Sequence, residues 1–211
     1  MALQLDARIS HQAHRSIWKL SDAMELPGHE IVGQRLVGAL PSAELADMWC
    51  RITSKIVKYG FGICYRDLEP PRTGIFNGLT ITLDPDVGFE MQCFILLHLF
   101  GHSVQWVAPS LQNSLHDLQH THDKETFLKV LRNYEFEAAR LGMTLLHEAG
   151  VTALDQWYSD FVETDWRYVR HYYREGMIPD WDACRAQGCT IIEPIPIPEL
   201  GLREVTVRFA F

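Results

Sequence analysis

Several features that would assign this chain to a common class are missing. None of its apolar runs approaches the roughly 20 residues that a membrane-spanning helix needs, and the longest run, Cys93 to Leu97, ends at His98. The first residues lack a basic start followed by an apolar segment, so no signal peptide is expected. The sequence therefore predicts no association with a membrane.

Cysteine and positive charge are also scarce. The five cysteines are scattered and odd in number, which favours reduced thiols in a cytoplasm over a framework of disulfides. The net charge is −8 at pH 7, and no cluster of Lys and Arg provides the basic surface that phosphate binding requires. We therefore expect a cytoplasmic protein that does not bind nucleic acid.

The common signatures of nucleophilic enzymes are absent too. No G-x-S-x-G motif occurs, and Cys93 lies within an apolar run rather than beside a base. Neither a serine nor a cysteine nucleophile is therefore supported by the sequence.

Length and composition favour one α+β domain over residues 1–211. The chain has 211 residues, of which 47% are hydrophobic, and it contains no internal repeat or domain boundary. The apolar periodicity predicts a mainly helical core over 42–175 and an extended C-terminal segment over 190–211. The expected helices cover 9–20, 42–58, 87–107, 123–149 and 152–175, and the expected strands cover 61–65, 75–83, 190–192 and 205–211. Asn77-Gly78 either lies within the second strand or splits it into a hairpin.

The most informative motif is His98-Leu-Phe-Gly-His102, within the expected helix 87–107. Two histidines four residues apart lie one turn above each other on a helix and can hold one metal ion. In the HExxH helix of metalloproteases, the residue after the first histidine is a glutamate that activates water. Leu99 occupies that position here and cannot accept a proton.

A metal site needs a third ligand, and the next long helix offers two carboxylates. Glu137 is the first candidate, because a crossing helix can place one carboxylate beside both imidazoles. Glu135 lies two residues earlier, so it points to a different side of the helix. Glu135 is the alternative ligand, or a hydrogen-bonding partner of the ligands.

The stretch from Gly74 to about Gly150 resembles the ImmA/IrrE family of gluzincin-like metallopeptidases. The resemblance rests on three motifs in order: Leu79-Thr-Ile-Thr-Leu-Asp-Pro-Asp86, then Phe94-Ile-Leu-Leu-His98-Leu-Phe-Gly-His102, then Glu135-Phe-Glu137-Ala138. It implies a zincin-like domain, with a small sheet beside the metal-binding helix and with His98, His102 and Glu137 as ligands. The family uses a glutamate where this chain has Leu99, so peptide hydrolysis by the family's route is not expected.

A proton acceptor must then come from elsewhere. The candidates are Glu135, Glu148 beside His147, and the loop histidines His116, His120 and His122. In gluzincins, a His or Tyr of a later helix steadies the developing oxyanion, and the resemblance makes His171 and its neighbours Tyr168, Tyr172 and Tyr173 the candidates for that role.

These residues predict an enzyme with one divalent metal ion (Zn, Fe or Mn) and a small-molecule substrate. Hydrolysis of a non-peptide molecule is the first hypothesis. A non-haem Fe(II) oxygenase or oxidase with two His and one carboxylate is the second, and a non-catalytic binding or regulatory module is the third. The aromatic residues between 157 and 181 pack helices together, or they line an apolar substrate pocket: Trp157, Tyr158, Trp166, Tyr168, Tyr172, Tyr173 and Trp181.

Overall fold

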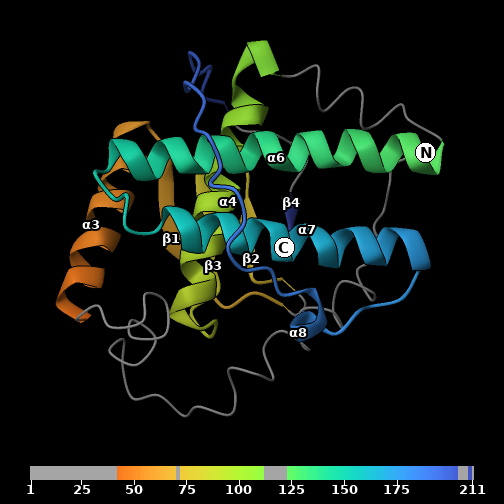
Figure 1. Cartoon of the computed structure of the whole chain (residues 1–211). Coiled ribbons are helices and arrows are strands. Elements are labelled where there is room, and N and C mark those ends of the chain that lie inside the picture. Colours follow the sequence, from red (N-terminus) through yellow and green to blue (C-terminus); the bar gives the residue numbers. More distant parts are fainter. Residues whose placement is uncertain (1–41, 70–71, 112–122, 204–208, 211) are drawn as a thin grey trace.

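The computed structural model describes residues 42–69, 72–111, 123–203 and 209–210 (Figure 1). The described part forms one mainly helical α+β domain, as the sequence predicts. Its helices are α3 (Ser42–Lys58), α4 (Phe89–Val107), η1 (Pro109–Leu111), α6 (Lys124–Glu148), α7 (Asp155–Glu175) and α8 (Trp181–Cys184).

A small sheet lies beside the helices. Its strands are β1 (Gly62–Tyr65), β2 (Gly74–Phe76), β3 (Thr80–Leu83) and β4 (Phe209–Ala210), in the order β1-β3-β2-β4. β1 pairs with β3 in parallel, whereas β2 pairs with β3 and β4 in antiparallel fashion. The hairpin alternative for 75–83 is confirmed: Asn77 Oδ1 accepts hydrogen bonds from the backbone N–H groups of Leu79 and Thr80, and Gly78 adopts a φ of 88°.

Helix α4 is the centre of the domain. It contacts β2 and β3 of the sheet and also contacts α6, and every residue from Cys93 to Val107 is buried. A helix that is apolar on most sides suits such a position between two layers. Figure 1 shows α6 and α7 lying side by side, with α4 crossing them at a steep angle.

The helices α4 and α6 meet at their backbones. A Cβ atom added at Gly101 of α4 would lie 2.1 Å from the carbonyl oxygen of Ala138 on α6, a distance that no real contact reaches. Only glycine at position 101 therefore permits this crossing, and it explains why a residue that weakens a helix stands in its middle.

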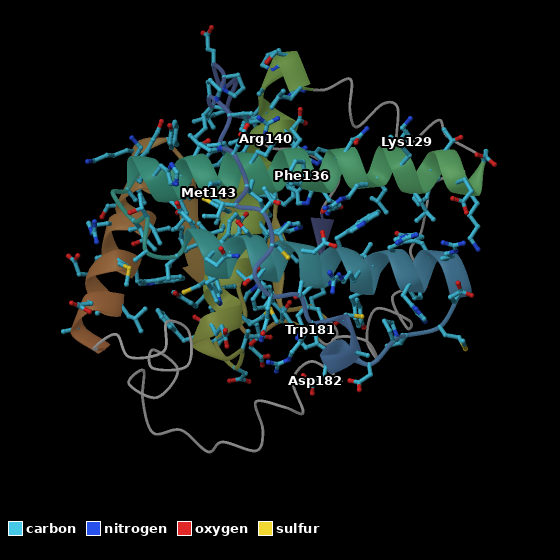
Figure 2. All side chains as sticks on the ribbon, in the orientation of Figure 1. Lys129, Phe136, Arg140, Met143, Trp181 and Asp182 are labelled. Atoms are coloured by element: carbon cyan, nitrogen blue, oxygen red, sulfur yellow. The ribbon has the colours of Figure 1, made fainter. Side chains whose placement is uncertain are left out.

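The C-terminal segment runs along the outside of α6. Its backbone carbonyl oxygens at Glu193 and Ile195 accept hydrogen bonds from Arg140 Nε (2.9 Å) and Thr144 Oγ1 (2.6 Å). Farther on, the Gly201 N–H donates to the Val107 carbonyl oxygen (2.9 Å). Figures 1 and 2 show this segment crossing α6 near Arg140.

The prediction of a strand at 190–192 is wrong. The Ile192 N–H donates to the Ser159 hydroxyl of α7 (3.0 Å), so a side chain takes the place that a neighbouring strand would have. Of the strand expected at 205–211, only 209–210 is described, and it forms β4. The helix expected at 9–20 lies outside the described residues. Among the described helices, none combines the length and the apolar character needed to cross a lipid bilayer.

The crossing of α4 and α6 gives a prediction with a definite sign. Helix propensity alone makes Gly101→Ala stabilising by about 1 kcal/mol. Contact with the Ala138 backbone makes the same change destabilising, by about 1–3 kcal/mol, because the helices must move apart. Urea unfolding followed by circular dichroism measures the difference, and a more stable variant would contradict the crossing described here.

Candidate metal centre

The two histidines of the HxxxH motif face the same side of α4. His98 and His102 have exposed fractions of 3% and 0%, and their Nε2 atoms lie 3.0 Å apart. Each ring rests on an aromatic neighbour: Phe94 stacks on His98 at 5.5 Å and Tyr134 stacks on His102 at 4.9 Å between centroids. These contacts hold both imidazoles in place within the core.

Glu135 is the carboxylate that α6 brings to the histidine pair. Its Oε2 atom lies 3.3 Å from His98 Nε2 and 3.2 Å from His102 Nε2. Glu137, the first candidate in the sequence, does not join this group and instead accepts a hydrogen bond from Gln105. The two glutamates are about 200° apart around α6, so the helix can turn only one of them toward the histidines.

The spacing of these three atoms fits one metal ion. Bonds of about 2.0–2.1 Å place neighbouring ligand atoms about 3.3 Å apart on a tetrahedron and about 3.0 Å apart on an octahedron. The three measured separations, 3.0, 3.2 and 3.3 Å, lie in this range. His98, His102 and Glu135 therefore form a group that can hold a divalent ion of either geometry.

Gln105 determines which nitrogen of His102 carries the hydrogen. Gln105 Nε2 donates to the Tyr134 carbonyl oxygen (2.9 Å) and to Glu137 Oε2 (2.9 Å). Gln105 Oε1 must then be the atom that faces His102 Nδ1 at 2.8 Å. Since an amide oxygen only accepts, His102 Nδ1 donates, and the neutral ring presents its Nε2 lone pair to His98 and Glu135. This is the tautomer that metal ligation through Nε2 requires.

Glu135 is held in its ionised form. Burial by itself raises the pKa of its carboxyl. When the imidazoles of His102 and His98 hold a proton toward Glu135, their charges and hydrogen bonds outweigh burial and hold the pKa well below its usual range. The group therefore presents an anionic oxygen beside the two imidazoles.

Leu99 lies in the core against the sheet. It is fully buried, and its Cδ1 atom lies 2.8 Å from where a Cβ atom would stand at Gly74 of β2. The position that bears the water-activating glutamate in metalloproteases is therefore filled by apolar packing here.

The other expected proton acceptors are not brought to the histidine pair. Glu148 pairs with Lys55 Nζ at 2.9 Å and lies roughly 20 Å along α6 from Glu135, at 1.5 Å per residue. His147 binds Asp155 at 2.9 Å at the corner between α6 and α7. His171 makes no hydrogen bond or ion pair with the histidine pair in the described part of the chain. His116, His120 and His122 lie outside the described residues.

The aromatic residues of α7 mainly connect helices. Phe161 stacks on Phe94 of α4 at 4.2 Å between ring centroids and also contacts Trp181 at 5.7 Å. Trp181 begins α8, below α7 in Figure 2, and packs edge-on against Tyr168. These contacts favour the packing interpretation of the aromatic stretch.

Asp165 of α7 is a further acidic residue that interacts electrostatically with His98 and Glu135, and the sequence did not indicate it. Burial raises the pKa of its carboxyl to about 6, with His98 opposing and Glu135 reinforcing the rise. The signal available in the sequence is its position, one turn from Phe161 and nearly one turn from Tyr168, on a stripe that is otherwise apolar. A carboxyl on such a stripe must face either solvent or a polar site.

A second acidic group, Asp67, Asp84 and Asp86, lies at the end of β3. The Asp84 carboxylate accepts hydrogen bonds from the backbone N–H groups of Leu68 (3.3 Å) and Asp86 (2.9 Å). These bonds account for the buried Asp84 as a residue that shapes the turn.

No family model, curated protein or solved structure matches this chain.

The tautomer of His102 can be measured in the metal-free protein. We expect ¹⁵N-labelled histidine NMR at pH 8 to show hydrogen on Nδ1 of His102, and we expect Gln105→Leu to remove this preference. Glu137→Gln is the control, because an amide oxygen at that position still accepts from Gln105. A dominant Nε2–H form in the unaltered protein would contradict the described network.

The raised pKa of Asp165 makes a prediction for stability. A carboxyl whose pKa is raised on folding destabilises the fold as pH rises from about 4 to about 6. Asp165→Asn should therefore stabilise the metal-free protein at pH 7.5, by up to about 3 kcal/mol, and the gain should vanish near pH 4. Urea unfolding at both pH values tests this.

Asp155→Asn is the matched control on the same helix. It alters the 2.9 Å contact between the Asp155 carboxylate and His147 Nε2 and should lower stability at pH 7.5. A loss of stability in Asp165→Asn at this pH would contradict the stated environment of Asp165.

Proposed function

We propose that this protein is an enzyme with one divalent metal ion held by His98, His102 and Glu135, and that it hydrolyses a small, non-peptide molecule. The observation that carries the proposal is the convergence of three donor atoms at metal-ligand spacing. When bound, such an ion polarises a carbonyl or phosphoryl oxygen and lowers the pKa of water.

The electrostatics of the group support a cation at this point. When the His102 ring is neutral, its Nε2 lone pair and the Glu135 carboxylate face each other at 3.2 Å. Two acceptors this close repel one another unless a proton or a cation lies between them. A divalent ion satisfies both acceptors and His98 together.

The resemblance to the ImmA/IrrE family supports a metallopeptidase-like scaffold for this proposal. The HxxxH helix, the strand before it and the glutamate-bearing helix after it occur in the family's order. Leu99, packed against the sheet, supports a substrate and a proton acceptor that differ from those of the peptidases.

A non-haem Fe(II) oxidoreductase is the second candidate. Two histidines and one carboxylate are the ligand set of those enzymes, and the 3.0 Å separation of the two Nε2 atoms suits an octahedral ion. The aromatic rings beside the imidazoles, Phe94 and Tyr134, suit a small apolar or aromatic substrate.

Metal analysis of protein purified without a chelating column tests both candidates. We expect about one equivalent of Zn, Mn or Fe in the unaltered protein. His98→Ala and Glu135→Gln should retain less than about a tenth of it, because each removes a ligand. Glu137→Gln should stay within about tenfold of the unaltered affinity, since it changes only a residue behind the ligands.

The identity of the metal separates the alternatives. Zinc or manganese with hydrolysis under anaerobic conditions supports the proposal. Iron with oxygen-dependent turnover supports the oxidoreductase instead. Absence of metal in the unaltered protein would contradict both and favour a binding or regulatory module.

A further inference from the structure

Asp165 lies on the side of α7 that faces the candidate metal centre. One turn before it, Phe161 stacks on Phe94, and Phe94 stacks on His98. Just after it, Trp166 and Val169 pack against the cluster that contains Tyr134, whose ring stacks on His102. Contacts on both sides of Asp165 thus lead to the two histidines.

The charges agree with this position. Asp165 interacts electrostatically with His98 of α4 and with Glu135 of α6, and also with the hydroxyls of Tyr158 and Tyr168 on its own helix. No hydrogen bond or ion pair within the described part of the chain holds its carboxyl. The carboxyl therefore lies on the side of α7 toward the centre, and no described residue holds it in a hydrogen bond or ion pair.

Asp165 is close to the ligands without belonging to them. The ligand atoms of His98, His102 and Glu135 all lie within 4.8 Å of one another, and Asp165 is not a member of that group. A general base acts either directly or through one water molecule. Asp165 is outside the ligand group but interacts electrostatically with His98 and Glu135. Its carboxyl therefore suits contact with the ligands through a water molecule at the centre.

Several other carboxylates on these helices have different partners. Glu137 accepts from Gln105, Glu148 pairs with Lys55, and Glu163 pairs with Arg132. Glu90 accepts from Trp157 Nε1. Among these described acidic residues, Asp165 is the one that faces His98 and Glu135 without being a ligand.

We propose that Asp165 is the proton acceptor of the hydrolytic reaction. It would take the role that the glutamate after the first histidine has in metallopeptidases. This inference rests on the proposed function. As the oxygen of the attacking water bonds to the substrate's carbonyl carbon, one proton of that water passes to the Asp165 carboxylate. The carboxyl returns the proton to the leaving oxygen or nitrogen as its bond to carbon breaks. The products are a carboxylic acid and an alcohol or amine, and Asp165 is again ionised.

Cobalt(II) provides a test that does not need the substrate. Co²⁺ alone is titrated into the apoprotein, and its visible absorption bands are followed from pH 5 to pH 10. We expect one equivalent to bind to the unaltered protein and to Asp165→Asn, with dissociation constants within threefold. We expect the midpoint of the spectral change with pH to fall by more than half a unit in Asp165→Asn, because removing a negative charge makes the nearby water a stronger acid.

Glu163→Gln is the matched control. It removes a carboxylate of the same helix, two residues away and bound to arginines instead, and should move the midpoint by less than 0.2 units. An unchanged midpoint in Asp165→Asn would overturn the inference. A loss of cobalt affinity beyond 100-fold would also overturn it, because Asp165 would then be a ligand.

Two further outcomes, failure of the variants to fold and failure of the unaltered protein to bind cobalt, have different meanings. Asp165→Ala is measured in parallel, and failure of both variants to fold would make Asp165 a structural residue and overturn the inference. Failure of the unaltered protein to bind cobalt would overturn the proposed function together with this inference, whereas an unchanged midpoint overturns this inference alone.

Discussion

The contact between the backbones of α4 and α6 at Gly101 and Ala138 determines the rest of the site. Gly101 lies next to His102 and three residues from His98 on one helix, and Ala138 lies three residues from Glu135 on the other. The same close approach lets Gln105 reach the Tyr134 carbonyl and Glu137. A wider crossing would separate the carboxylate from the imidazoles and remove the group that orients His102. One missing Cβ atom therefore underlies both the donor atoms and their orientation.

A polar group of this kind is costly inside an apolar core unless its atoms satisfy one another. His102 uses both ring nitrogens, one toward Gln105 and one toward His98 and Glu135. Aromatic rings cover the faces of both imidazoles, so water does not complete the arrangement from those sides. The result is a small polar centre. Its two facing acceptors, His102 Nε2 and the Glu135 carboxylate, still need a positive charge between them.

The sequence predicted the four long helices of the described part and the histidine pair, and it offered the hairpin as one of two alternatives, because each depends on local spacing. Residues four apart share a helix face in any fold, and Asn-Gly favours a tight turn wherever it occurs. The choice between Glu135 and Glu137 was not local. It depends on how far α6 is rotated about its axis, which the Ala138 contact and the Tyr134 ring determine. Asp165 was overlooked for the same reason, since its importance arises only when α7 packs across two other helices.

Leu99 and Asp165 both bear on which residue can accept a proton: Leu99 cannot, whereas Asp165 carries a carboxyl. A glutamate at position 99 would have to lie among Ile95, Gly74 and the sheet, where Leu99 now fills a fully buried space. An ionised carboxylate there would lose its hydration without a described polar partner. A carboxyl on α7 approaches the centre from another side and keeps the sheet packing intact. In the mechanism we propose, fold and reaction do not share the residue that follows the first histidine: apolar packing occupies that position, and the carboxyl of Asp165 on α7 accepts the proton.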